Sequence, residues 1–383
     1  MFEPSASSEP FGGYVHVPWC RRRCPYCDFY FEVGAPSAAY VDGLRAELLG
    51  RASDTSGKTL ASLYFGGGTP TALEASQLAA IIQMMSQVVG FTDSAEITVE
   101  ANPEDLSGNL VRDLRNAGVN RLSLGIQSFD DSSLRFLGRG HDRATALQAL
   151  VWAKEIQDVS VDLIIGLPDD SAQRVLSDIE IIADHEIAHV SVYLLTVEPL
   201  TPMWKQIQAK RRPDVDSDRQ ADLYAQMQDM LARAGYQQYE VSSFSLPMRQ
   251  SAHNRLYWSQ GTYVGLGPAA HSMLLNSDGS VSRRANIRSV TQWLADPAGP
   301  VFEIESLPPE TAFREALAFG LRDLDRGIHV NRLEQRHGVN LSKEQERELR
   351  WCVEKGWLKG SSGHYRLTQK GVLFADAVAR ALL

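Results

Sequence analysis

From residue 14 to about residue 240, short apolar segments alternate with longer segments whose apolar residues recur at helical spacing. This alternation is typical of repeated βα units, in which helices cover a parallel sheet. The expected strands lie near residues 13–17, 62–65, 96–100, 121–125, 160–165 and 189–194, and the expected helices cover 38–49, 76–89, 107–117, 145–156 and 174–185. Six such units predict an α/β fold, a partial, open (β/α)6 TIM-like barrel with its ligand site at the C-terminal ends of the strands.

Three of the four cysteines of the chain, Cys20, Cys24 and Cys27, follow the first expected strand in the run CRRRCPYC. Thiolates are the ligands of iron–sulfur clusters, and three of them can hold three irons of a [4Fe-4S] cube while the fourth iron stays open to a small molecule. A closed zinc site is the weaker interpretation because it normally has four Cys or His ligands. Three unrelated buried or disulfide-linked cysteines remain as an alternative, which the flanking Pro18 and Pro25 and the close spacing disfavour.

Polar residues and glycines follow the other expected strands. Gly66, Gly67 and Gly68 precede Thr69, and a glycine run lets a backbone turn sharply and approach a ligand closely. Taken alone, such a run is more often an ordinary tight turn. The strand-end residues Glu100, Gln127 and Asp162 are each, without further context, only weak candidates for a binding role.

The motifs occur in an order that resembles a known family. They are YVHVPWCRRRCPYCDF (14–29), YFGGGTPT (64–71), VEANPE (99–104), GVNRLSLGIQSFDD (118–131), DLIIGLP (162–168), HNRLYW (253–258) and YVGLGPAAHS (263–272). This arrangement resembles the radical S-adenosylmethionine (SAM) superfamily. Within it, the chain is most similar to the HemW branch, the heme chaperones, of the oxygen-independent coproporphyrinogen III oxidase-like (HemN/HemW) family.

The resemblance implies that Cys20, Cys24 and Cys27 hold a [4Fe-4S] cluster whose open iron binds the amino and carboxylate groups of SAM. It implies nine SAM contacts, at Tyr14, Tyr26, Gly67, Gly68, Thr69, Glu100, Gln127, Arg139 and Asp162. Arg139 would offer a fork for the carboxylate, and the acidic and amide groups would suit the ribose hydroxyls and the ammonium group. One electron from the reduced cluster would then cleave the sulfonium C–S bond and give a 5′-deoxyadenosyl radical.

Two departures distinguish the branches of this family. The dehydrogenase branch carries a further cysteine two positions after the third one, where this chain has Phe29, and it has a longer N-terminal extension. Oxidative decarboxylation of coproporphyrinogen III is therefore the disfavoured alternative, and whether the chain is an enzyme stays open. HNRLYW matches a pattern associated with heme binding, which makes His253 the candidate heme ligand. On sequence alone, a histidine in this setting is more often a hydrogen-bonded structural residue.

After residue 304 the sequence becomes mostly helical. Phe313, Ala316 and Leu317 recur at helical spacing, Ser342 and Gln345 form a capping box, and a short strand pair flanks the turn 360–363. This region resembles the winged-helix-like C-terminal domain of the family, so we divide the chain into 1–240, 241–304 and 305–383. From Glu305 onward the sequence contains 13 Lys and Arg and 11 Asp and Glu residues. This near-balance of charge favours a role as a lid or a protein-contact surface over DNA binding.

Composition limits the possible partners and the cellular location of the protein. A net charge of −9 argues against nucleic-acid binding, the first 13 residues lack an apolar core, and no apolar stretch is long enough to span a bilayer. We therefore expect a cytoplasmic protein, with peripheral membrane contact left open. Its expected partners are heme-accepting proteins and an electron donor such as a flavodoxin or ferredoxin. The leading interpretation is a heme chaperone that carries a [4Fe-4S] cluster and SAM, and a winged-helix regulator that senses iron–sulfur status is a distant third.

Overall fold

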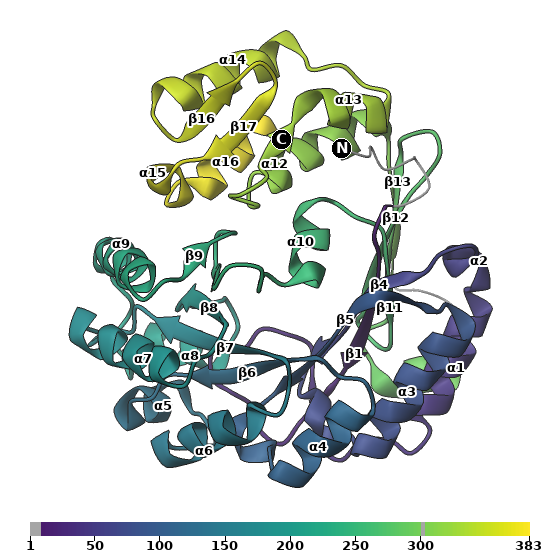
Figure 1. Cartoon of the computed structure of the whole chain (residues 1–383), viewed down its shortest axis with the longest axis vertical. Coiled ribbons are helices and arrows are strands. Elements are labelled where there is room, and N and C mark those ends of the chain that lie inside the picture. Colours follow the sequence, from purple (N-terminus) through teal and green to yellow (C-terminus); the bar gives the residue numbers. More distant parts are fainter. Residues whose placement is uncertain (1–8, 300–302) are drawn as a thin grey trace.

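The computed structural model describes residues 9–299 and 303–383, and in these residues twelve strands form one sheet. Its centre is a run of parallel strands in chain order (Figure 1). They are β1 (Phe11–Val17), β4 (Leu60–Gly67), β5 (Phe91–Ala101), β6 (Arg121–Gln127), β7 (Asp158–Ile165) and β8 (His189–Leu194). All six predicted strands are confirmed, and the partial barrel that they form is the predicted architecture.

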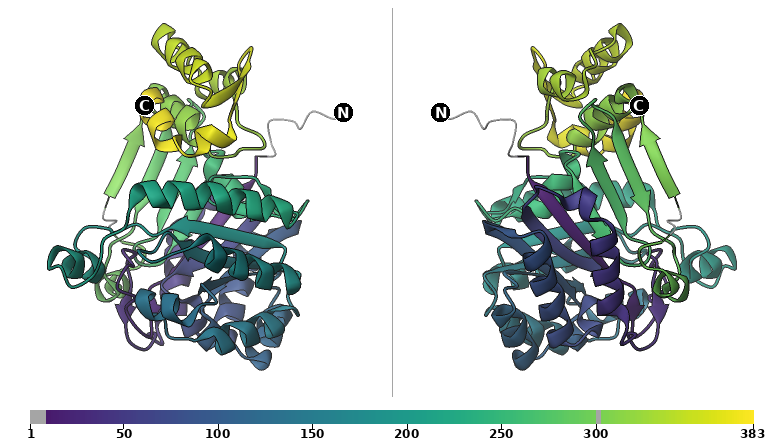
Figure 2. Two further views of the ribbon diagram at one scale, coloured as in Figure 1. Left: turned by 90° about the vertical axis from the view of Figure 1, so that its left-hand side faces the viewer. Right: turned by 90° about the vertical axis from the view of Figure 1, so that its right-hand side faces the viewer.

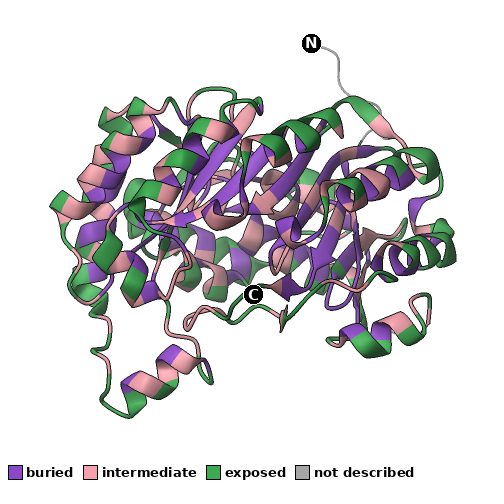
Figure 3. Ribbon diagram, turned by 90° about the horizontal axis from the view of Figure 1, so that it is seen from below, coloured by how far each residue is buried: buried purple, intermediate pink, exposed green. Residues whose placement is uncertain are grey.

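The helices between these strands cover the outer face of the sheet. The five predicted helices are present as α1 (Tyr40–Gly50), α3 (Ala75–Val88), α4 (Gly108–Asn116), α6 (Arg143–Ala153) and α7 (Ala172–Asp184). The structure also contains four helices for which the sequence pattern gave no prediction. They are α2 (Ala52–Thr55), α5 (Asp131–Leu137), α8 (Pro202–Gln208) and α9 (Ser217–Arg233). Figure 3 shows largely buried strands with helices whose outer faces are exposed, because the apolar side of each helix packs on strand residues such as Leu63, Val99 and Val161.

The segment predicted to be a connection, 241–304, also contributes strands to the sheet. β11 (Tyr263–Leu266) lies parallel to β1, and β12 (His271–Leu275), β13 (Val281–Ala285) and β14 (Glu303–Leu307) continue beyond it with antiparallel pairing. At the other edge, β10 (Ser243–Ser245) and β9 (Gln237–Gln238) follow β8. Helix α10 (Ala252–Trp258) lies between the two sides of the open barrel (Figure 1). The division of the chain into domains at residues 240 and 304 stays a prediction.

A buried polar cluster joins α1 to these late strands. The carboxylate of Glu47 accepts hydrogen bonds from the Gly267 amide (2.8 Å), the Asn286 side chain (2.6 Å) and the indole of Trp293 (3.0 Å), which lies on α11 (Val290–Ala295). Arg51 donates to the Gly265 carbonyl oxygen at 2.7 Å. Since a buried carboxylate is stable only when it is hydrogen-bonded and paired, this cluster fixes the position of β11 beside β1.

The C-terminal region has the predicted winged-helix-like arrangement. It contains α12 (Pro309–Gly320), β15 (Ile328–His329), α13 (Val330–His337), α14 (Lys343–Glu354), β16 (Leu358–Ser361), β17 (His364–Leu367), α15 (Gln369–Val372) and α16 (Ala375–Leu382). The capping box of Ser342 and Gln345 is present. Figure 2 shows this region at the end of the barrel where β1 begins. Across the described residues, no helix has the length and apolar character that crossing a membrane requires.

Candidate functional site

The cysteine loop follows β1, at the C-terminal ends of the parallel strands. Its residues include β2 (Trp19–Cys20) and β3 (Glu32–Val33), and the Cys27 amide donates to the Cys24 carbonyl oxygen at 3.2 Å. All three cysteines are half-buried free thiols. Burial raises the pKa of Cys20 to about 11 and that of Cys27 in the same direction, since it disfavours the charged thiolate. A bound iron would take the place of these protons.

Among the described residues, no three Cys, His, Asp or Glu side chains converge closely enough to hold one metal ion. Three thiols are one fewer than the four Cys or His ligands of a closed zinc site, whereas each thiolate of a cluster binds its own iron. The donor set of three thiols therefore fits the predicted [4Fe-4S] group.

Two predicted SAM residues contact the predicted cluster ligands directly. Thr69 Oγ1 donates to Cys20 Sγ at 3.4 Å, and Arg139 Nη1 donates to Cys24 Sγ at 3.3 Å. Asn102 joins the two donors, because its amide group donates to Thr69 Oγ1 at 3.0 Å and its carbonyl oxygen accepts from Arg139. Asn102 was missed by the sequence interpretation, although it lies within the VEANPE motif.

The glycine run packs tightly against the cysteine loop. The Gly68 amide donates to the Val17 carbonyl oxygen and the Thr69 amide to that of Trp19, both at 2.8 Å. A Cβ atom on Gly68 would lie 2.7 Å from the Trp19 oxygen and 2.8 Å from the Val17 oxygen. Gly67 has φ +106°, a backbone region that favours glycine. The sequence predicts a sharp turn and a close approach to a ligand, and the structure shows that neighbouring protein backbone also requires glycine at position 68.

Replacing Gly68 with alanine is therefore expected to lower iron content as well as SAM binding. The added Cβ would meet backbone oxygens that can move only together with Cys20, and overpacking of this kind costs about 1–3 kcal/mol. Iron analysis and calorimetry after anaerobic reconstitution measure the two effects. Gly108→Ala is the control, because its Cβ would make only an ordinary contact, 3.4 Å from Trp152. Full iron content and unchanged SAM affinity in Gly68→Ala would contradict the account.

Two carboxyl groups with raised pKa values lie inside the barrel. Burial raises the pKa of Glu100 to about 7, although hydrogen bonds from Tyr64 and the Gly67 amide oppose the shift and the nearby Asp162 adds to it. Burial likewise raises the pKa of Asp162 to about 6, against hydrogen bonds from Ser123 and Ser191. Tyr64 donates to Glu100 Oε1 at 2.7 Å. A cationic ligand between two such groups would favour their ionised forms.

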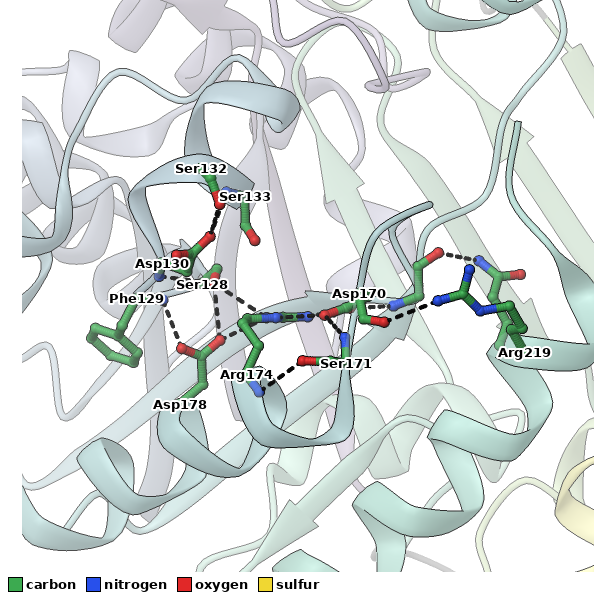
Figure 4. Close-up of polar contacts among 12 residues, drawn as sticks. Ser128, Phe129, Asp130, Ser132, Ser133, Asp170, Ser171, Arg174, Asp178 and Arg219 are labelled. Carbon is green, nitrogen blue, oxygen red and sulfur yellow. Dashed lines mark hydrogen bonds and ion pairs between the residues drawn. The ribbon is translucent and has the colours of Figure 1, made fainter. Parts of the chain in front are cut away.

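Gln127 has φ +69°, which is uncommon for a residue other than glycine and is typical of functional positions. The residues that follow it are held by a buried aspartate of α7. Asp178 accepts from Ser128 Oγ and the Phe129 amide, both at 3.0 Å, and pairs with Arg174 at 2.7 Å (Figure 4). Sequence reasoning missed this support, whose only signal is the i, i+4 spacing of Arg174 and Asp178.

The two tyrosines of the predicted site differ in their surroundings. The Tyr14 hydroxyl donates to His16 Nδ1 at 3.0 Å, and His16 Nε2 lies 3.0 Å from the Tyr30 carbonyl oxygen, so this histidine links β1 to the cysteine loop. Tyr26 lies beside Arg139, whose Nη1 is 3.5 Å from the phenol oxygen. Both tyrosines therefore lie in the same part of the molecule as the cysteines.

His253 contacts β4 nearer its start than the glycine run does, and its ring stacks on that of Tyr64. Its Nδ1 is 2.9 Å from the hydroxyl of Ser62, near the start of β4, whereas the glycine run begins at the end of that strand. The ring is completely buried, and burial lowers its pKa to about 3. Within the described part of the chain, Nε2 has no hydrogen-bond partner. The imidazole is thus neutral, with one nitrogen unused.

Comparison with known proteins agrees with this geometry. The profile of the radical SAM superfamily matches residues 14–182, and that of the HemN C-terminal domain matches 307–374. The chain is 32% identical to the heme chaperone HemW of Bacillus subtilis, over 97% of this chain and 98% of that protein. It is 30% identical to HemW of Escherichia coli, over 98% of both chains, and 33% identical to the bovine mitochondrial radical S-adenosyl methionine domain-containing protein 1, over 99% and 89%.

Among solved structures, coproporphyrinogen III oxidase (HemN) of Escherichia coli superposes with a TM-score of 0.83 over 98% of this chain and 90% of that one. At 22% identity this likeness supports the fold alone. Fold, cysteine loop and sequence matches together place the chain in the radical SAM superfamily. Within that superfamily it belongs to the HemW family.

Proposed function

We propose that this protein is a heme chaperone, which binds heme and passes it to acceptor proteins while carrying a [4Fe-4S] cluster and SAM. The observation that carries the cofactor part is the pair of hydrogen bonds from Thr69 and Arg139 to Cys20 and Cys24. Residues expected to hold SAM already contact the thiols expected to hold the cluster. The heme part is supported by the full-length likeness to HemW proteins.

In this proposal, Cys20, Cys24 and Cys27 bind three irons, and SAM binds the fourth. Bound SAM and a reduced cluster supply one-electron cleavage of the sulfonium C–S bond. The protein's residues orient SAM: Arg139 receives its carboxylate, and Glu100, Gln127 and Asp162 receive its ammonium and ribose hydroxyls. Tyr14, Tyr26, Gly67, Gly68 and Thr69 complete the walls of the site.

Heme binding is proposed to involve His253 as an axial ligand. The free Nε2 and the neutral ring suit iron coordination. Because the His253 ring is completely buried, heme iron can reach Nε2 only when α10 moves away from the barrel. Heme ligation is therefore expected to be coupled to local opening of α10.

Replacing His253 with alanine is expected to remove or shift the Soret band of bound heme while the iron–sulfur signal stays, since no cluster ligand is touched. Absorption spectra of anaerobically reconstituted protein titrated with heme measure both. His189→Ala is the matched control, because His189 is also fully buried and is also held by a serine, Ser160, at 2.7 Å. An unaltered Soret band in His253→Ala, or equal loss in both variants, would return His253 to a structural role.

The runner-up is an oxygen-independent coproporphyrinogen III dehydrogenase. Phe29 stands at the position of the further cysteine in that branch, and this residue is 76% exposed. The proposed setting is the cytoplasm, with a flavodoxin or ferredoxin as electron donor. Parallel assays of heme binding and of coproporphyrinogen turnover distinguish the two functions.

A further inference from the structure

A line of packed rings links the predicted SAM site to α10. Tyr14 stacks on Tyr64 with 6.3 Å between ring centroids, Tyr64 stacks on His253 at 5.1 Å, and His253 contacts the edge of Tyr257 at 4.7 Å. Tyr64 lies on β4 and the last two rings on α10. Aromatic rings at these distances stabilise one another beyond simple burial, so a change in the position of one ring affects its neighbour.

Tyr64 belongs to this line and to the predicted SAM site at once. Its hydroxyl donates to Glu100 Oε1 at 2.7 Å while its ring forms the surface against which His253 stacks at an interplanar angle of 23°. The function proposed above uses Glu100 and His253 but gives Tyr64 no role. No other residue of the site makes both contacts in the described structure.

Helix α10 is also held by several other groups, among them the buried Leu256 side chain, the ring of Tyr263 against Tyr257, and the polar contacts that follow. Glu96 of β5 accepts from the amides of Ala252 (2.9 Å) and His253 (3.0 Å). Arg255 pairs with Asp325 of the C-terminal region, and the guanidinium of Arg322 lies 4.5 Å from the Trp258 ring centroid. A helix of seven residues cannot persist by itself, so the Tyr64 stack is one of the contacts that determine how often it opens.

We propose that Tyr64 transmits the occupation of the SAM site to α10, so that SAM bound at Glu100 holds this helix against the barrel. The inference rests on the proposed SAM site. It adds a form of regulation to that site. Because heme ligation by His253 requires α10 to move away from the barrel, SAM and heme bind antagonistically. By thermodynamic reciprocity, each ligand lowers the binding affinity of the other.

The physical step is a change in the Tyr64–Glu100 hydrogen bond. The pKa of Glu100 is about 7 in the unliganded protein, because burial disfavours its charge, so the carboxyl is partly protonated at neutral pH. The cationic ammonium and sulfonium groups of SAM favour the carboxylate. A hydrogen bond from Tyr64 to a charged oxygen is about twice as strong as one to a neutral oxygen, which fixes the ring beneath His253.

Hydrogen exchange of the α10 amides tests the proposal. In anaerobically reconstituted wild-type protein, saturating SAM is expected to slow exchange in residues 253–258 about tenfold. In Tyr64→Phe, which keeps the stacked ring and removes only the hydroxyl, SAM is expected to leave this exchange unchanged. Tyr236→Phe is the matched control, because it removes a buried hydroxyl whose hydrogen bond goes to the Ile187 carbonyl oxygen and not to Glu100, and it should behave as wild type.

Calorimetry on the same samples tests SAM binding separately from the coupling between the SAM site and α10. SAM binding without slower exchange in wild type, or equal slowing in Tyr64→Phe, would overturn the coupling and leave the proposed function intact. Failure of wild-type protein to bind SAM would overturn the proposed site and the coupling with it. Ser62→Ala gives an independent check, since it removes the hydrogen bond to His253 Nδ1 and leaves the hydrogen bond between Tyr64 and Glu100 in place. Its exchange is expected to be faster without SAM and still to slow about tenfold with SAM.

Discussion

Replacing Cys24 with alanine is expected to reduce the iron content of anaerobically reconstituted protein from about four atoms per chain to near zero, with loss of the visible charge-transfer absorption. A cube held by three thiolates has no spare protein ligand, and the one remaining cysteine, Cys352, is buried in the C-terminal region on α14. Iron analysis and absorption spectroscopy measure the effect.

Cys352→Ala is the matched control and should keep all of its iron. Its thiol is completely buried among apolar residues of the C-terminal core, away from the cysteine loop. Unchanged iron content in Cys24→Ala, or loss of iron in Cys352→Ala, would remove the cluster assignment.

The second large effect is expected from Arg139→Gln. Arg139 donates to Cys24 Sγ and to the Gly125 carbonyl oxygen (2.8 Å), and its buried Nε has no partner in the described part of the chain. Loss of a charge-assisted contact to the SAM carboxylate costs about 2 kcal/mol, roughly a 30-fold weaker SAM affinity. The cluster should still form, because its three ligands remain.

Calorimetry with SAM, beside iron analysis, checks this expectation. Arg135→Gln is the control, since Arg135 is exposed on the neighbouring helix α5 and should bind SAM as wild type does. Equal SAM affinity in Arg139→Gln and Arg135→Gln would show that Arg139 supports the loop rather than the ligand.

The barrel could be predicted because its signals are local. Each parallel strand is a short apolar run followed by a helix with an apolar face, so β4 and α3 are recognisable from their own residues. The cysteine loop and the strand-end residues follow, since all parallel strands end at the same edge of the sheet. The contact between Thr69 and Cys20 is a consequence of that topology.

The remaining features depend on contacts between distant segments. Nothing in the residues of β11 indicates that it pairs with β1, because Glu47 of α1 fixes its position through the Gly267 amide. Likewise, the motif HNRLYW does not show whether His253 faces solvent or the barrel. Its burial arises from Ser62 and Tyr64, which precede it by almost two hundred residues.

The central claim, a heme chaperone rather than a dehydrogenase, is tested most directly by one anaerobic experiment on reconstituted wild-type protein. Half of each sample is titrated with heme in the absence of SAM, and half is incubated with coproporphyrinogen III, SAM and a reductant. The account predicts saturation near one heme per chain, and no protoporphyrinogen formed. Multiple turnovers of coproporphyrinogen III with matching SAM cleavage, and no saturable heme binding, would contradict it.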